Sequence, residues 1–264
     1  MQRIILGLEY QGQVFCGWQT QTNAHSVQAT LEAALARIAG HHVRVHAAGR
    51  TDTGVHASLQ ILHFDTTAKR PLSAWTRGVN SYLPASISVR WAEQTDAIFD
   101  GFHARFSALQ RHYQYLIHTA PNRSALWGAR SSYWHTKLDI FSMQAAGQCL
   151  LGEHDFSSFR SSECQAKSPV KNISALDIHR PAEDLILINI SANAFLHHMV
   201  RNIAGCLIYI GAGRWPAHKM QTVLDSKNRV LAAPTAPANG LTLIGVDYPT
   251  QFKLPENRRP AIFL

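Results

Sequence analysis

Short β-prone segments alternate with helical segments along the whole chain, and this alternation limits the folds that the chain can adopt. Apolar, β-branched stretches bounded by turn residues predict strands at 3–10, 43–47, 58–65, 86–93, 111–118, 173–179, 185–192 and 241–248. Longer stretches with apolar residues at helical spacing predict helices at 26–40, 72–83, 139–151, 194–210 and 219–224. In the first of these helices, Ser26 is the expected cap and Gly40 the expected stop.

Some predicted strands follow one another directly, whereas others are separated by a helix. This mixture favours an α+β fold with a mixed or antiparallel sheet. The second part of the chain repeats the order of elements in the first, so two similar halves are expected. We place the boundary in the stretch FDGFHARFSALQ, which gives an N-terminal α+β half at 1–105 and a C-terminal α+β half at 106–264.

The charge balance points to a polyanionic partner, since the net charge is +8 with neutral histidines. The cysteines are far apart and form no C-x-x-C pair, which argues against a zinc ribbon or a disulfide framework. No stretch is apolar enough to cross a bilayer, and the N-terminal residues do not resemble a signal peptide. We therefore expect a cytoplasmic protein with reduced thiols and no membrane association.

The stretch GRTDTGVH places one carboxylate, Asp52, beside Arg50 and between two glycines. Half of an aspartic protease dyad is one interpretation, but Arg50 would keep the carboxylate ionised and hinder the proton sharing that a dyad needs. The other interpretation is a single ionised carboxylate that acts on a glycosidic carbon. This chemistry suits a good leaving group such as uracil. Gly49 and Gly54 are expected to provide unusual backbone angles or close approach. A turn-capping Asp52 beside a surface cation is the non-functional alternative.

A family resemblance decides between these interpretations. GRTDTGVHA resembles the catalytic motif of the tRNA pseudouridine synthase A family. The resemblance extends over nearly the whole chain, through LEYQGQVFCGWQ, SVQATLEAAL, GVNSYLP, FHARFSA, RHYQYLI, LLGEHDFSSFR, ANAFLHHMVRNIAG, APTAPANGLTL and VDYP. These motifs occur in the order that the family has them.

The resemblance implies a fold and a reaction. The fold is two pseudo-symmetric α+β halves whose strands join into one continuous sheet, with helices on one side and the active-site cleft between the halves. The reaction breaks the bond between uracil N1 and ribose C1′ and joins C5 to C1′, at uridines 38, 39 and 40 of the tRNA anticodon stem-loop. The family works as a homodimer on tRNA without a cofactor or a metal.

The resemblance also implies roles for five residues. Asp52 is the catalytic carboxylate, which either attacks C1′ or abstracts a sugar proton. Tyr113 stacks on the flipped uracil, and its hydroxyl can take the C5 proton. Arg201 pairs with the catalytic carboxylate, Leu241 packs against the target base, and Arg50 binds phosphate near the flipped nucleotide or fills the space that the base leaves.

The sequence itself adds three points about the region of Arg201. A charged residue on an otherwise apolar helix is costly unless it is paired, which independently indicates an anionic partner for Arg201. His197 is expected one turn earlier on the same face of the predicted helix. The pair His197–His198 lacks the spacing of a zinc site, so no metal is expected there.

A non-catalytic RNA-binding or chaperone protein on the same scaffold is the competing function.

Overall fold

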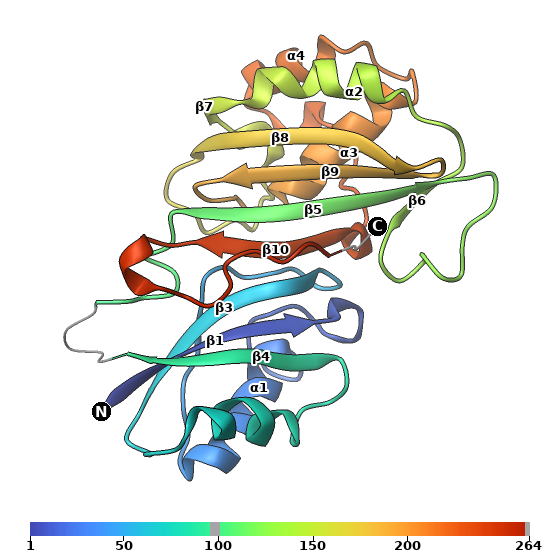
Figure 1. Ribbon diagram of the computed structural model, residues 1–264. Helices are drawn as coiled ribbons and strands as arrows, with labels where there is room; N and C mark the ends of the chain where they lie inside the picture. The colour runs from blue at the N-terminus through green and yellow to red at the C-terminus, as the bar shows by residue number, and fades with distance from the viewer. Residues whose placement is uncertain (96–100, 262–264) are drawn as a thin grey trace. The chain divides into compact units, whose positions relative to one another are not determined.

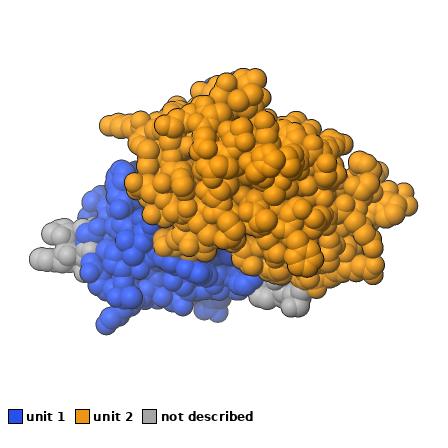
Figure 2. Space-filling model, turned by 90° about the horizontal axis from the view of Figure 1, so that it is seen from above, with its two compact units in different colours: residues 1–109, 242–263 blue, residues 110–241, 264 orange. Residues whose placement is uncertain are grey.

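The computed structural model describes residues 1–95 and 101–261 (Figure 1). By their internal contacts these residues form two compact units, which Figure 2 shows in two colours. Unit 1 holds the described residues up to 109 together with 242–261, and unit 2 holds 110–241. No helix among the described residues combines the length and apolarity needed to cross a membrane.

Unit 1 is built on a mixed sheet in the order β4-β1-β3-β10, with the short β2 paired to β3. The strands are β1 (Gln2–Tyr10), β2 (His46–Ala47), β3 (His56–Thr66), β4 (Ile87–Thr95) and β10 (Leu241–Asp247). The long central strands run antiparallel, and β10 joins β3 in parallel through the pair Thr242 and His56. The last strand of the chain therefore packs with the first strands.

Helix α1 (Val27–Ala39) begins and ends where the sequence predicts. The Ser26 side chain accepts a hydrogen bond from the Ala29 amide at 3.2 Å, and Gly40 ends the helix in the left-handed region at φ +75°. The predicted helix at 72–83 is a short helical segment containing the π-helical turn η2 (Ala74–Gly78), with Trp75 buried against Phe64.

Unit 2 is built on a second set of strands in the order β5-β9-β8-β7, all antiparallel, with β6 added in parallel to β5. The strands are β5 (Gln110–Thr119), β6 (Ser132–Trp134), β7 (Gly152–Asp155), β8 (Val170–Ala182) and β9 (Leu185–Ala192). The helices are α2 (Ile140–Gly147), α3 (Met199–Gly211) and α4 (Lys219–Ser226), which pack on one another (Figure 1). The predicted α+β class is confirmed.

The structure differs from the sequence predictions in three places. Strands β6 and β7 were not predicted, since three or four residues are too few to show an alternating pattern. Helix α3 begins at Met199 rather than at 194, because His198 has a left-handed backbone at φ 64° that no helix can continue through. The expectation that His197 shares a helical face with Arg201 is therefore wrong.

The division into units also departs from the predicted halves. The change from unit 1 to unit 2 falls at 109/110, close to the predicted boundary at 105/106. Residues 242–261, however, pack in unit 1 instead of the C-terminal half, because β10 extends the sheet beside β3.

Candidate active site

Asp52 opens a tight turn just before strand β3. The Val55 amide donates a hydrogen bond to the Asp52 carbonyl at 3.1 Å, which closes the turn over four residues. Gly54 occupies the third position with φ +82°, the value that a type II turn requires there and that L-residues avoid. The expectation for Gly54 is confirmed. The expectation for Gly49 is wrong, because its φ is not left-handed and a Cβ built on it would meet nothing within 4 Å.

The segment after β1 fixes this turn by close backbone contact. A Cβ built on Gly12 would lie 1.9 Å from the Val55 carbonyl oxygen, so only glycine allows this approach. The Trp18 amide donates to the Thr51 carbonyl at 3.0 Å. The turn is thus held by a segment about 40 residues earlier in the chain, as the separation of Gly12 from Val55 shows.

Tyr10 contacts Thr51, the residue directly before Asp52. Its hydroxyl lies 2.8 Å from the Thr51 hydroxyl, and its side chain is 4% exposed. Burial raises the pKa of Tyr10 to about 12, so the phenol stays neutral at any ordinary pH. Tyr10, Gly12 and Trp18 all lie in the motif LEYQGQVFCGWQ, but nothing in its sequence reveals that they contact the Asp52 turn.

The two charged residues of the motif differ in exposure. Asp52 is half-buried, whereas Arg50 is exposed. The backbone before them is anchored by Gln60, whose side-chain amide donates to the Gly49 carbonyl at 2.8 Å. Unit 1 therefore presents a carboxylate at a fixed position that solvent, and hence a substrate, can still reach.

In unit 2, Tyr113 and Tyr115 point to the same side of β5, since they are two residues apart on a strand. The Tyr113 ring packs edge-on against Phe195 with 5.2 Å between centroids, and its side chain is 8% exposed. Tyr115 is fully buried and donates to the Pro237 carbonyl at 2.9 Å. Burial raises the pKa of Tyr115 above its ordinary value. Tyr115 is therefore a structural residue, and Tyr113 is the one that keeps some exposure.

Arg201 lies in the first turn of α3 and is tied to the loop that precedes β10. Its Nε donates to the Ala236 carbonyl at 2.9 Å, and the Ala236 amide donates to the Arg201 carbonyl at 3.1 Å. Because Pro237 accepts from Tyr115, the same loop connects β5 with the start of α3.

A buried asparagine fastens this loop to the helix. The Asn202 side chain is fully buried, and its Nδ2 donates to the Phe159 carbonyl at 2.7 Å. Its Oδ1 accepts from the Thr235 hydroxyl at 2.7 Å and from the Arg229 guanidinium at 3.1 Å. The sequence does not predict this network, because a polar residue on an apolar helix does not reveal its partners.

Leu241 begins β10 and is 5% exposed. The turn before it is anchored by Asn239, whose Nδ2 donates to the carbonyls of Gly128 and Ser131, both at 2.8 Å. In unit 2, a single loop thus accepts hydrogen bonds from both Arg201 on α3 and Tyr115 on β5. Leu241 follows directly after that loop.

His197 lies in an irregular segment and not on α3. Its amide contacts the Cys164 sulfur at 3.4 Å, and its carbonyl accepts from the Ser161 amide at 3.0 Å. The rings of His197 and His198 lie 4.0 Å apart. The expected residues are therefore divided as follows: Arg50 and Asp52 are in unit 1, and Tyr113, Arg201 and Leu241 are in unit 2.

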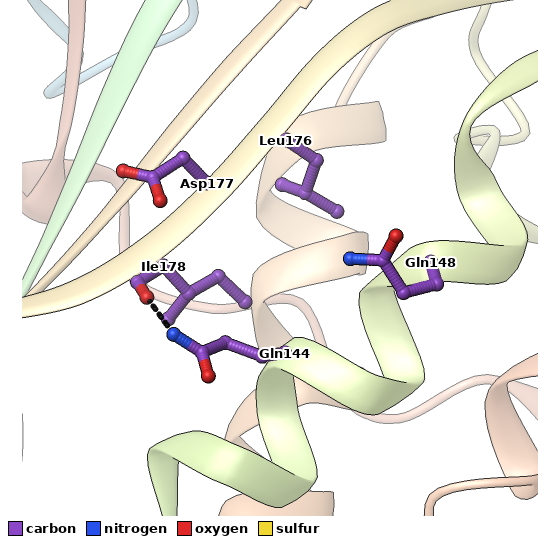
Figure 3. Close-up of a pocket in the computed structure, with 5 residues that line it drawn as sticks. All are labelled: Gln144, Gln148, Leu176, Asp177 and Ile178. Carbon is purple, nitrogen blue, oxygen red and sulfur yellow. Dashed lines mark hydrogen bonds between the residues drawn. The ribbon is translucent and has the colours of Figure 1, made fainter.

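A separate hollow of about 220 Å³ lies between α2 and β8 of unit 2 (Figure 3). Gln144 reaches across it and donates to the Ile178 carbonyl at 2.6 Å. Its one ionisable lining residue, Asp177, already bonds His179 at 2.7 Å and Asn189 at 3.2 Å. None of the five expected site residues lines this hollow.

Comparison with known proteins identifies the family. The family model described as tRNA pseudouridine synthase matches residues 8–107 and 146–249. Two curated relatives named tRNA pseudouridine synthase A are 52% identical: one from Chromobacterium violaceum over 98% of each chain, and one from Psychromonas ingrahamii over 99% of each. A third, from Paraburkholderia xenovorans, is 51% identical over 97% of this chain and 93% of its own. By these matches, the chain belongs to the tRNA pseudouridine synthase family, whose members isomerise uridine to pseudouridine in tRNA.

Proposed function

We propose that this protein forms pseudouridine at positions 38, 39 and 40 of the tRNA anticodon stem-loop. The observation that carries the proposal is the half-buried Asp52, held on a turn whose backbone is fixed from two sides. A carboxylate at a fixed place can act on C1′ of a nucleotide that has been flipped out of its stack. The net charge of +8 suits a polyanionic substrate.

In the proposed reaction, the bond from N1 to C1′ breaks and a bond from C5 to C1′ forms. The proton on C5 leaves, and N1 of the product carries a proton, so the change is an isomerisation without an external reactant. Asp52 either attacks C1′ or removes a sugar proton, and both routes need its carboxylate ionised. The exposed Arg50 binds a phosphate next to the flipped nucleotide.

Three residues of unit 2 complete the proposed site. Tyr113 stacks on the uracil and its hydroxyl takes the C5 proton, a role that fits a ring with its own edge-on support from Phe195. Arg201 pairs with the Asp52 carboxylate, and Leu241 packs against the base.

The proposed working form is a homodimer in the cytoplasm, acting on tRNA. Sedimentation of the purified protein tests the dimer separately from the chemistry. A single species at twice the mass of the 29.3 kDa chain is expected, and a monomer at all concentrations would contradict that part of the proposal.

Three tRNA transcripts, each with one uridine at position 38, 39 or 40, test the proposed function. Chemical mapping of pseudouridine is expected to find conversion at each of these positions, and none with Asp52→Ala. Conversion only at other positions of the tRNA would support the proposed reaction but refute the proposed positions 38, 39 and 40. Binding of tRNA without any conversion by the folded wild type would favour the RNA-binding alternative.

A further inference from the structure

Aromatic and cationic side chains alternate around the end of helix α3 in unit 2. The Arg214 guanidinium lies over the rings of Trp134 and Tyr209, at 5.0 Å from each centroid. The Tyr209 ring contacts Trp215 edge-on at 5.2 Å, and the Lys219 ammonium lies 6.0 Å from the Trp215 ring. We call these five residues the aromatic ladder. They come from β6, α3, α4 and the loop between the two helices.

The rings hold Arg214 but do not satisfy its hydrogen-bond donors. A guanidinium stacked on aromatic faces keeps its N–H groups in the plane of the group, directed away from the rings. Among residues 1–95 and 101–261, no carboxylate or carbonyl forms an ion pair or hydrogen bond with the side chain of Arg214 or Lys219. Arg214 is exposed, so its donors remain available to an outside acceptor.

Two acceptors at the C-terminal end of α3 and the adjoining start of α2, the Tyr209 carbonyl and the Asp139 carboxylate, are already engaged. The C-terminal end of α3 lies against the start of α2, where the Asp139 amide donates to the Gly211 carbonyl at 2.8 Å. The Asp139 carboxylate caps α2 by accepting from the Phe141 amide at 2.9 Å and from the Ser142 hydroxyl at 2.6 Å. The Tyr209 carbonyl accepts from the amides of Arg214 and Trp215 at 3.0 and 3.3 Å. The negative end of the helix is thus partly neutralised by its own backbone.

We propose that Arg214 of the aromatic ladder binds a phosphate of the tRNA backbone. A planar guanidinium with a fixed orientation matches two oxygens of a phosphate, and Lys219 adds a second positive charge. Interleaved aromatic and basic residues are also the usual composition of surfaces that bind nucleic acid. This inference rests on the proposed function, which makes tRNA the substrate.

The position of the ladder indicates which part of the substrate it contacts. Arg201, a residue of the proposed site, and Tyr209 of the ladder are eight positions apart on the same helix. At 1.5 Å per residue, they are separated by roughly 12 Å along its axis. The phosphate that Arg214 binds therefore belongs to a nucleotide several steps from the target uridine. Its contact contributes to affinity and leaves the chemical step unchanged.

The test is the salt dependence of binding of a tRNA transcript with uridine at position 39. Arg214→Ala should raise Kd about tenfold, the effect of one charged hydrogen-bonded contact. It should also reduce the slope of log Kd against log salt by about 1. The rate of uridine conversion with saturating enzyme should equal that of the wild type. Arg37→Ala, which removes one exposed cation from α1, serves as the matched control and should change neither quantity.

Two further variants separate phosphate binding from a structural role. Arg214→Lys keeps the charge without the planar fork, so it should keep the wild-type salt slope while Kd rises by a few-fold. Trp134→Leu should weaken tRNA binding in the wild type and have no further effect in Arg214→Ala. An unchanged Kd and slope in Arg214→Ala, with or without a lower melting temperature, would overturn the inference. A wild type that binds tRNA without converting uridine would refute the proposed function instead.

Discussion

The two units position their candidate site residues by different physical means. In unit 1, the Asp52 turn is fixed by backbone against backbone, with Gly12 packed on Val55. In unit 2, Arg201 and its loop are fixed by hydrogen bonds, centred on the buried side chain of Asn202. Close backbone contact leaves no room for adjustment, whereas a network of several bonds can lose one and keep the others.

This difference predicts two kinds of response to substitution. In unit 1, adding a single methyl group should displace the Asp52 turn, so activity and stability should both fall. In unit 2, the loss should increase with the number of hydrogen bonds removed. Variants at matched positions in the two units can therefore test this difference.

The largest effect is expected for Gly12→Ala. Its Cβ would lie 1.9 Å from the Val55 carbonyl oxygen, so the turn must shift. Displacing a catalytic group by about an ångström reduces the rate roughly 10²-fold, and overpacking costs up to about 3 kcal/mol of stability. Gly49→Ala, in the same motif but with open space around it, is the control and should behave as the wild type. Equal activity of the two variants, measured by pseudouridine formation, would refute backbone positioning.

Asn202→Ala should have a large but graded effect. The substitution removes the hydrogen bonds of Asn202 to the Phe159 carbonyl, Thr235 and Arg229, which costs about 2–3 kcal/mol, although Arg229 still donates to the Thr235 hydroxyl at 3.0 Å. Thr235→Val keeps the bond from Asn202 to Phe159 and removes only the bonds of the Thr235 hydroxyl to Asn202 and Arg229, so it should cost about 1–2 kcal/mol, less than Asn202→Ala. Urea unfolding measures both, with activity assayed in parallel. Losses of the same size in the two variants would show that the network does not act bond by bond.

The smallest effect at neutral pH is expected for Tyr10→Phe, which removes the hydrogen bond to Thr51 and costs about 1 kcal/mol. Burial raises the pKa of Tyr10 to about 12 in the folded protein, from an ordinary value of 10.0. The unfolded chain therefore loses this proton first, and the wild type loses stability as the pH rises from 10 to 12. Two pKa units correspond to roughly 2.7 kcal/mol.

Tyr10→Phe lacks this titration, so its unfolding free energy should fall less steeply above pH 10 than that of the wild type. Urea unfolding of both proteins at pH 7, 10 and 11 provides the comparison. Parallel pH profiles would show that Tyr10 does not remain protonated in the folded state.

The sequence predicted what depends on local patterns. Ser26 and Gly40 bound α1 as expected, because a cap and a stop act within one helical turn. Gly54 was predicted correctly, because a D-T-G turn needs a left-handed glycine. Gly12 and Asn202 could not be assigned roles, because their partners lie far away in the chain. The start of α3 was misplaced, because nothing in a pair of histidines indicates that His198 adopts φ 64°.

We propose that the fixed carboxylate of Asp52 performs the chemistry. The most direct test is tritium release from tRNA labelled at uracil C5, with enzyme in excess, for the wild type and Asp52→Asn. Removing a group of this kind should reduce the rate at least roughly 10³-fold, while Kd for tRNA changes little. Release by Asp52→Asn at the wild-type rate would show that the reaction does not use the Asp52 carboxylate. The turn would then position a residue without a role in the chemistry.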